Sequence, residues 1–162
     1  MRLVLFCFTL LISGIAAAAV LNPELKPNGS YDKPVLEIGK PAKPEWTETT
    51  VKASVNHKPV QGKQKTLIGE IIDVSCYNQV GKHGVVHKAC GMGCATGGAP
   101  IGLLTEDGTV YLISPEEHDP RRDQKTTLRP ILINYMASIV KVHGTVTNVD
   151  GVKTVYVQGY TK

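Results

Sequence analysis

The chain has 162 residues, of which 42% are hydrophobic and 20% charged, and its formal net charge is +4. This length fits one modest globular domain and excludes a large multidomain enzyme. The near-balanced charge gives no basis for a nucleic-acid partner.

The N-terminus has the pattern of a secretory signal peptide. Met1-Arg2 is followed by an apolar run from Leu3 to Ile15 and then by four alanines. The run is shorter than the ~20 apolar residues of a membrane-spanning helix, and no later segment approaches that length. We therefore expect residues 1–18 to be a signal peptide. The mature protein would have no transmembrane segment and would be exported, to the periplasm or the extracellular space.

Residues 19–64 have the composition of an extended arm. They hold six of the ten prolines, several lysines and few apolar side chains. Burial of so little apolar surface cannot offset the entropy lost on ordering, so a packed structure is disfavoured. We expect a Lys/Pro-rich arm with one docked patch around Trp46, available for contact with an envelope protein.

The remaining residues, 65–162, alternate between strand and turn signals. Five segments are rich in β-branched residues and bounded by turn residues, as strands are: 67–74, 100–105, 109–114, 138–147 and 152–158. Asp107-Gly108 predicts a tight hairpin between the second and third of them. The apolar spacing over 127–136 predicts a helix with Pro130 in its first turn.

This order of elements predicts a mainly β fold, namely a small five-stranded OB-like barrel. The prediction includes an inserted Cys/His helical segment after the first strand and one further helix before the fourth. Gly69 and Gly144 fall inside strand patterns and fit the tight bends of a small barrel.

The inserted segment contains the densest group of reactive side chains. Without the signal peptide, Cys7 is lost and only Cys76, Cys90 and Cys94 remain. If residues 84–96 form a helix, His87 shares one face with Cys90 and Cys94. Three hypotheses explain such a segment in an oxidising compartment.

The leading hypothesis is a metal site. Cys76, His87, Cys90 and Cys94 form a Cys3His set suited to tetrahedral zinc, and a thiolate-rich set also suits Cu(I). His83 and Met92 are further soft donors nearby. The protein would then be a copper- or zinc-binding module of the bacterial cell envelope.

The second hypothesis is a disulfide between Cys76 and either Cys90 or Cys94. It would add about 3 kcal/mol to the stability of a small domain and leave one thiol unpaired. The domain would then be an OB-like module that binds a protein or saccharide partner without metal.

The third hypothesis is thiol redox chemistry, in which His87 lowers the pKa of Cys90. The segment has no Cys-x-x-Cys and no carboxylate placed to orient the histidine. An enzyme is therefore disfavoured, and no catalytic residue is assigned.

These residues also carry a resemblance. The pattern resembles that of a group of short, largely uncharacterised exported bacterial proteins, and it consists of Cys76-Tyr77, Gly81-x-x-Gly84-x-x-His87-x-x-Cys90-x-x-x-Cys94, Gly98-x-Pro100-Ile101-Gly102-Leu103-Leu104 and Asp107-Gly108-x-Val110-Tyr111. It covers about residues 75–155. The resemblance implies an OB-like domain behind a signal peptide and a Cys/His set that acts as a unit, but no known reaction.

The sequence also makes predictions for two features outside the Cys/His segment. His143 should be exposed, because it alternates with Val142 along its strand. Tyr111, Tyr156 and Tyr160 could form a face on which a ligand stacks, although packing is the more common role of aromatic residues on strands.

Overall fold

The computed structural model describes residues 25–41, 44–116 and 128–158. The expected signal peptide and Tyr160 lie outside these ranges. The strands are β1 (Glu37–Ile38), β2 (Lys63–Asp73), β3 (Ile101–Thr105), β4 (Val110–Pro115), β5 (Ile139–Val149) and β6 (Val152–Val157). The α-helices are α2 (Glu48–Ala53), α3 (Val74–Val80), α4 (Lys88–Thr96) and α6 (Leu128–Asn134), with 3₁₀ turns η2 (Val55–His57) and η3 (Val85–His87).

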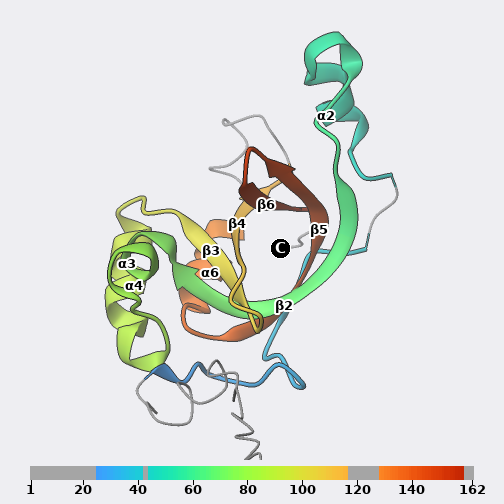
Figure 1. Ribbon diagram of the computed structural model, residues 1–162. Coiled ribbons are helices and arrows are strands. Elements are labelled where there is room, and N and C mark those ends of the chain that lie inside the picture. The colour runs from blue at the N-terminus through green and yellow to red at the C-terminus, as the bar shows by residue number, and fades with distance from the viewer. Residues whose placement is uncertain (1–24, 42–43, 117–127, 159–162) are drawn as a thin grey trace, which may run out of the picture.

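Five of the strands close into a barrel (Figure 1). The meander β2-β3-β4 is antiparallel, β4 pairs with β6 in parallel, β6 pairs with β5, and β5 returns to β2. Helix α6 lies between the third and fourth barrel strands in the sequence. This confirms the predicted mainly β, OB-like barrel, with the Cys/His segment inserted between its first two strands.

The barrel closes because β2 and β5 bend sharply while their apolar faces turn inward. A Cβ atom on Gly69 would lie 2.6 Å from the Leu104 carbonyl oxygen, and one on Gly144 would overlap the Tyr156 backbone. Glycine is therefore required where these strands cross their neighbours. The core that results includes Ile71, Leu103 and Val155, all with 0% exposure.

The described part of residues 19–64 contains helix α2, the turn η2 and the short strand β1, and β1 pairs with the barrel. Strand β1 lies parallel to β5, with Glu37 opposite Lys141 and Ile38 opposite Val142. Ile38 is only 3% exposed and joins the core. Further along the chain, Trp46 donates a hydrogen bond of 2.9 Å to the Val60 carbonyl oxygen and packs edge-on against Tyr156. The expected patch around Trp46 is thus one of several contacts between the arm and the barrel.

The paired arm corrects the expectation for His143. This histidine is 6% exposed rather than free in solvent. Its Nε2 lies 2.8 Å from Glu37 Oε1, and its Nδ1 lies 2.7 Å from Thr66 Oγ1. The alternation along β5 predicted the correct face, but it could not show that the arm covers this face.

The expected helix over 84–96 is shorter than predicted. Gly84 has a φ of 76°, in the left-handed region that does not continue a helix, and residues 85–87 form the turn η3. Helix α4 starts only at Lys88. A second helix, α3, carries Cys76, which the sequence pattern had placed at a strand end. Within the described ranges, no helix is both long and apolar enough to cross a membrane.

Candidate metal centre

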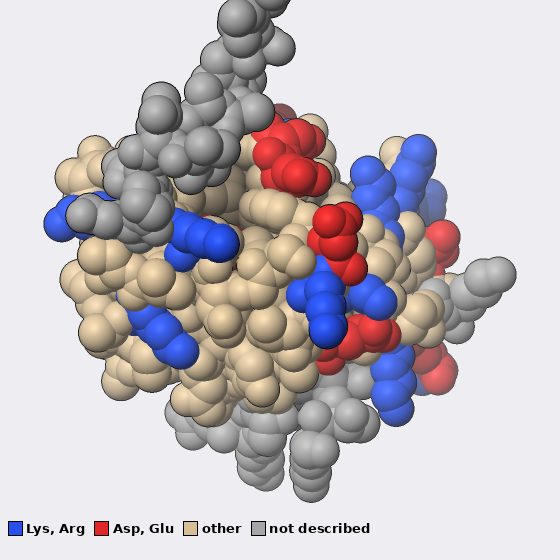
Figure 2. Space-filling model, turned by 90° about the horizontal axis from the view of Figure 1, so that it is seen from below, with Lys and Arg blue, Asp and Glu red and all other residues tan. Residues whose placement is uncertain are grey.

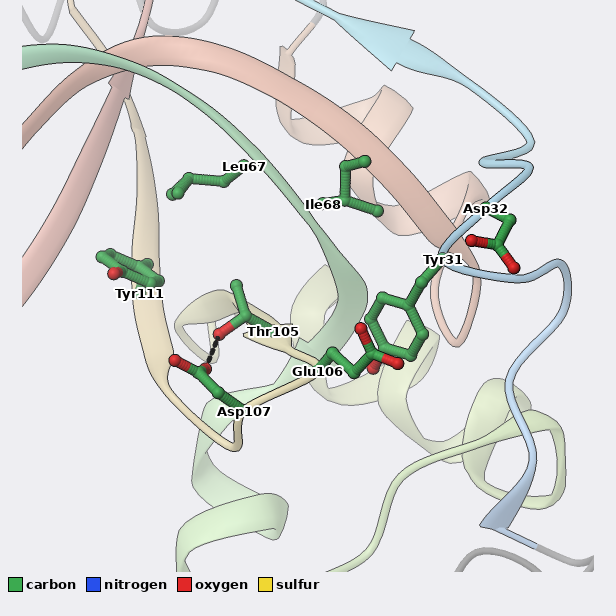
Figure 3. Close-up of a pocket in the computed structure, with 8 residues that line it drawn as sticks. All are labelled: Tyr31, Asp32, Leu67, Ile68, Thr105, Glu106, Asp107 and Tyr111. Atoms are coloured by element: carbon green, nitrogen blue, oxygen red, sulfur yellow. Dashed lines mark hydrogen bonds between the residues drawn. The ribbon is translucent and has the colours of Figure 1, made fainter. Parts of the chain in front are cut away.

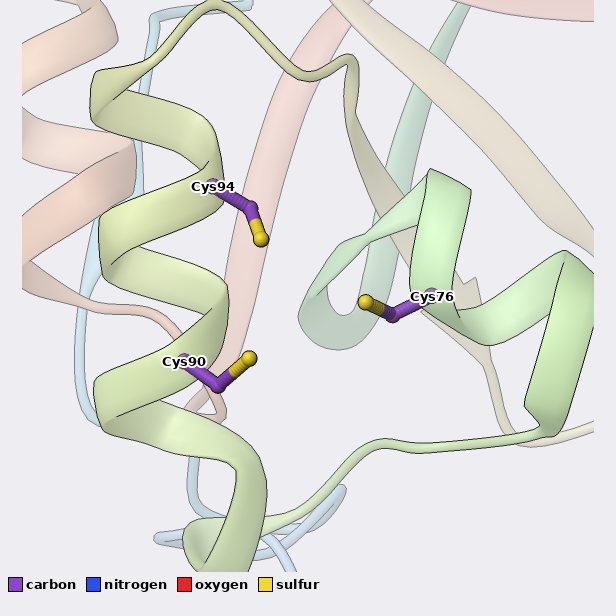
Figure 4. A group of neighbouring side chains, drawn as sticks. All are labelled: Cys76, Cys90 and Cys94. Carbon is purple, nitrogen blue, oxygen red and sulfur yellow. The ribbon is translucent and has the colours of Figure 1, made fainter.

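Three cysteine side chains meet between the two helices that connect β2 to β3. Cys76 projects from α3, and Cys90 and Cys94 project from α4 toward it (Figure 4). The three Sγ atoms all lie within 4.8 Å of one another. Three thiols at this separation could hold a metal ion.

Helix α3 presents Cys76 because Asp73 caps its first turn. Asp73 Oδ1 accepts hydrogen bonds from the backbone N–H groups of Ser75 at 2.9 Å and Cys76 at 3.4 Å. This side chain satisfies two of the donors that a helix N-terminus leaves free. Gly81, with a φ of 67°, ends the helix in the left-handed conformation.

Helix α4 presents Cys90 and Cys94 one turn apart on one face. The helix packs closely against the barrel, since a Cβ atom on Gly91 would lie 3.0 Å from Cγ of the buried Met136. Arg129 of α6 donates hydrogen bonds to the carbonyl oxygens of Ala95 and Ala99 at 2.5 and 2.8 Å. These contacts hold α4 against α6 and against the segment that leads into β3.

All three of these cysteines are free thiols, so the structure does not favour the disulfide hypothesis. Their exposure differs: Cys90 is exposed, whereas Cys76 and Cys94 are partly buried. The cluster thus has a solvent-facing side and an inner side.

His87 reaches the inner side of the cluster. It lies at the end of η3, just before α4, and is 6% exposed. One of its ring nitrogens lies within 4.8 Å of both the Cys76 Sγ and an Asp73 carboxylate oxygen. The predicted four-residue set therefore divides into a group of three thiols and a group of His87, Cys76 and Asp73, with Cys76 in both.

Asp73 sets the protonation of the neighbouring thiols. Hydrogen bonding to this carboxylate, partial burial and its negative charge together raise the pKa of Cys76 to about 11. The same causes raise the pKa of Cys94. Without a cation, both side chains are therefore neutral thiols near pH 7.

Two polar atoms of the inner group have no nitrogen or oxygen hydrogen-bond partner, and the only donors beside the Asp73 carboxylate are the weakly donating thiols of Cys76 and Cys94. Asp73 Oδ2 and His87 Nε2 are buried, and neither is bonded to a nitrogen or hydroxyl group of the described residues. They are the only buried side-chain atoms of this kind in the described ranges. An unsatisfied buried polar group costs about 1–3 kcal/mol, so its presence calls for a functional reason.

A buried carboxylate holds the loop that carries His87. Glu70 of β2 is 1% exposed and accepts a hydrogen bond of 2.6 Å from the Gly84 N–H. Its other oxygen lies 2.8 Å from His83 Nδ1. His83 thus pairs with Glu70 and does not join the thiols, while Met92 packs against the main hydrophobic core.

Sequence analysis found the three cysteines and His87 but missed Asp73 and Glu70. Both belong to a strand pattern, in which an acidic residue is expected to face solvent. Asp73 lies three residues before Cys76, which was a usable signal for a helix cap. The burial of Glu70 had no local signal, because it depends on the loop that folds over β2.

A separate, open pocket of ≈ 520 Å³ lies between β2, the turn that joins β3 to β4, and the arm (Figure 3). Tyr31 of the arm and Tyr111 of β4 are among its lining residues, with Leu67 and Ile68 on β2. Asp32, Glu106 and Asp107 add carboxylates. Burial, followed by the charges of Glu70 and Glu106, raises the pKa of Tyr31 to about 12, so its hydroxyl stays protonated.

The surface charge is mixed. On the face shown in Figure 2, basic and acidic side chains are interspersed over a largely uncharged surface. A nucleic-acid footprint would require a basic patch or stripe.

Comparisons of this chain with protein-family models, curated proteins and solved structures returned no match. The resemblance to exported bacterial proteins therefore stays a prediction, and the site has to be interpreted from its own chemistry.

Proposed function

We propose that this chain is an exported metal-binding module of the bacterial cell envelope that binds copper or zinc. Cys76, Cys90 and Cys94 are its thiolate ligands, and His87 is the adjoining nitrogen donor. The observation that carries the proposal is the convergence of three free thiols from two separate helices. A site that is rich in thiolates selects ions such as Cu(I) and Zn²⁺ over Ca²⁺ or Mg²⁺.

The inner group supports a metal rather than thiol catalysis. A redox or nucleophilic cysteine needs a lowered pKa, whereas Asp73 raises the pKa of Cys76 and Cys94. A bound cation reverses this effect, because it stabilises the thiolate and the carboxylate together.

The test is metal analysis of the protein purified from the envelope, combined with titration of its thiols. We expect stoichiometric copper or zinc and three thiols protected from alkylation until the metal is removed. Cys94→Ser should lower the affinity for Zn²⁺ at least 100-fold, measured by competition with a chromophoric chelator. Ser114→Ala, at a site on β4 outside the cluster, is the control. Metal-free protein with two oxidised cysteines would contradict the proposal.

Export is the second element of the proposal and has its own test. It rests on the N-terminal sequence from Met1 to Ala19. Cell fractionation should recover a shortened chain in the periplasm or the medium, and N-terminal sequencing should locate the cleavage. Retention of the uncleaved chain in the cytoplasm would contradict it.

A second function is favoured by the open pocket. Its volume lies within the usual range for small ligands, and tyrosine rings with carboxylates suit the stacking and hydrogen bonding of a saccharide. Binding of soluble oligosaccharides would be measured by tyrosine fluorescence, with Tyr31→Ala expected to abolish the change. An unchanged signal in the wild type would contradict this second function.

A further inference from the structure

We infer that the site holds two divalent ions of the zinc type rather than one, with the Cys76 thiolate bridging them. The outer ion would be bound by Cys76, Cys90 and Cys94, and the inner ion by Cys76, His87 and Asp73. This inference rests on the proposed metal site, because both positions use Cys76.

The arrangement of the donors supports two positions. Each set of three has its ligand atoms within 4.8 Å of one another, and the sets have only Cys76 in common. With Zn–S near 2.3 Å, two sulfur ligands of a tetrahedral zinc ion lie about 3.8 Å apart. The outer set therefore has to contract by about 1 Å or less, and the inner set, whose nitrogen and oxygen ligands bind zinc at shorter distances, by roughly 1.5 Å at most.

The two unpartnered atoms point to a ligand on the inner side. Asp73 is 0% exposed and His87 is 6% exposed, and each leaves one buried polar atom without a nitrogen or oxygen partner. Both residues line the same small space of ≈ 140 Å³. A cation coordinated by Asp73 Oδ2 and His87 Nε2 would satisfy both atoms at once.

The chemistry of the inner set selects zinc over copper. Sulfur, imidazole nitrogen and carboxylate oxygen together are a combination that Zn²⁺ accepts, whereas Cu(I) prefers soft donors and disfavours the carboxylate. Charge gives the same result. Three thiolates and one carboxylate carry four negative charges. Two divalent ions balance all four charges, whereas one divalent ion leaves two of them uncompensated beside the buried Asp73.

The Glu70–His83 pair is the positioning element for the inner ion. Glu70 binds the Gly84 N–H and His83, and these residues begin the loop that ends at His87. The loop that carries His87 is thereby held by groups that are not ligands of the outer ion.

The experiment is a titration of the reduced full chain with Zn²⁺ alone, in competition with a chromophoric chelator. We expect two zinc ions per wild-type chain. His87→Ala and Asp73→Asn should each leave one, and Cys76→Ser should lower the affinity of both positions. His57→Ala, which removes an exposed histidine of η2, should still bind two.

X-ray absorption at the zinc edge provides a second measurement. The average ligand set should change from mixed sulfur, nitrogen and oxygen in the wild type to mainly sulfur in His87→Ala. Circular dichroism confirms that each variant is folded. One zinc per wild-type chain, with the three thiols protected, would overturn the two-ion inference and leave the proposed function intact. Binding of neither Zn²⁺ nor Cu(I) would overturn both.

Discussion

His143 and His87 are equally buried but differ in whether their ring nitrogens have hydrogen-bond partners. His143, on the barrel side covered by the arm, is 6% exposed and has a partner at each ring nitrogen, Thr66 and Glu37. His87, beside the thiols, is also 6% exposed, yet its Nε2 has no partner among the described residues. Burial alone therefore does not identify the functional histidine. The unsatisfied nitrogen is the observation that sets His87 apart as the proposed ligand.

The largest expected effect is the stabilisation of the fold by Zn²⁺ bound at the proposed site that includes His87. At a free Zn²⁺ concentration 1,000 times the dissociation constant, binding should raise the free energy of unfolding by about 4 kcal/mol. Cys76→Ser should abolish the increase. Chemical denaturation with and without Zn²⁺ measures it. An equal increase in Cys76→Ser would mean that zinc binds elsewhere.

The next effect separates the two histidines in the metal-free protein. His143→Ala removes a buried ring together with its hydrogen bonds to Thr66 and Glu37, so stability should fall by about 1 kcal/mol. His87→Ala should cost less, because the wild-type ring already leaves Nε2 unsatisfied. Urea unfolding of both variants without metal tests the difference. A larger loss in His87→Ala would show that His87 is mainly structural.

A smaller effect concerns thiol reactivity. Asp73→Asn keeps a side chain that can cap α3 but removes the negative charge, so the pKa of Cys76 should fall from about 11 toward that of a free thiol. Alkylation of the metal-free protein at pH 8 should then be several-fold faster than in the wild type. Mass spectrometry of the modified cysteine measures the rate. An unchanged rate would show that Asp73 does not control this thiol.

The smallest expected effect concerns the pH dependence of Glu37, which is a hydrogen-bond partner of His143. Hydrogen bonds from Lys141 and His143 lower the pKa of Glu37. A carboxylate whose pKa is lower in the folded state than in the unfolded state stabilises the fold at pH values above its unfolded-state pKa. This stabilisation is lost as the pH falls through the folded-state pKa. Glu37→Gln should therefore lower Tm slightly at pH 7 and by less at pH 3, and both effects are small because Glu37 is largely exposed. Equal shifts at both pH values would contradict this.

The barrel could be predicted because its signals are local. Alternating β-branched residues, the Asp107-Gly108 turn and Pro130 in the first turn of α6 each depend on neighbours in the sequence. The contribution of β1 could not be predicted, because a two-residue strand has no periodicity and Ile38 is buried only by contact with β5.

Part of the candidate site could also be predicted, because that part depends on residues that are close in the sequence. The spacing of Cys90 and Cys94 on one helix is a local property. The approach of Cys76 depends on the cap at Asp73, and the position of His87 depends on Glu70, which is distant in sequence from the loop it holds. Gly84 also shortened the expected helix, so His87 leaves the face of the two cysteines and reaches Asp73 instead.

The connection between β2 and β3 also bears on the order of folding. Closing the barrel requires Lys63 to pair with Val146, and such a long loop is slow to form. All donors of the metal centre lie between Asp73 and Cys94, within the single connection from β2 to β3. Closure of this shorter loop costs roughly 1 kcal/mol less in chain entropy. The proposed ligands can therefore come together before β2 pairs with β5.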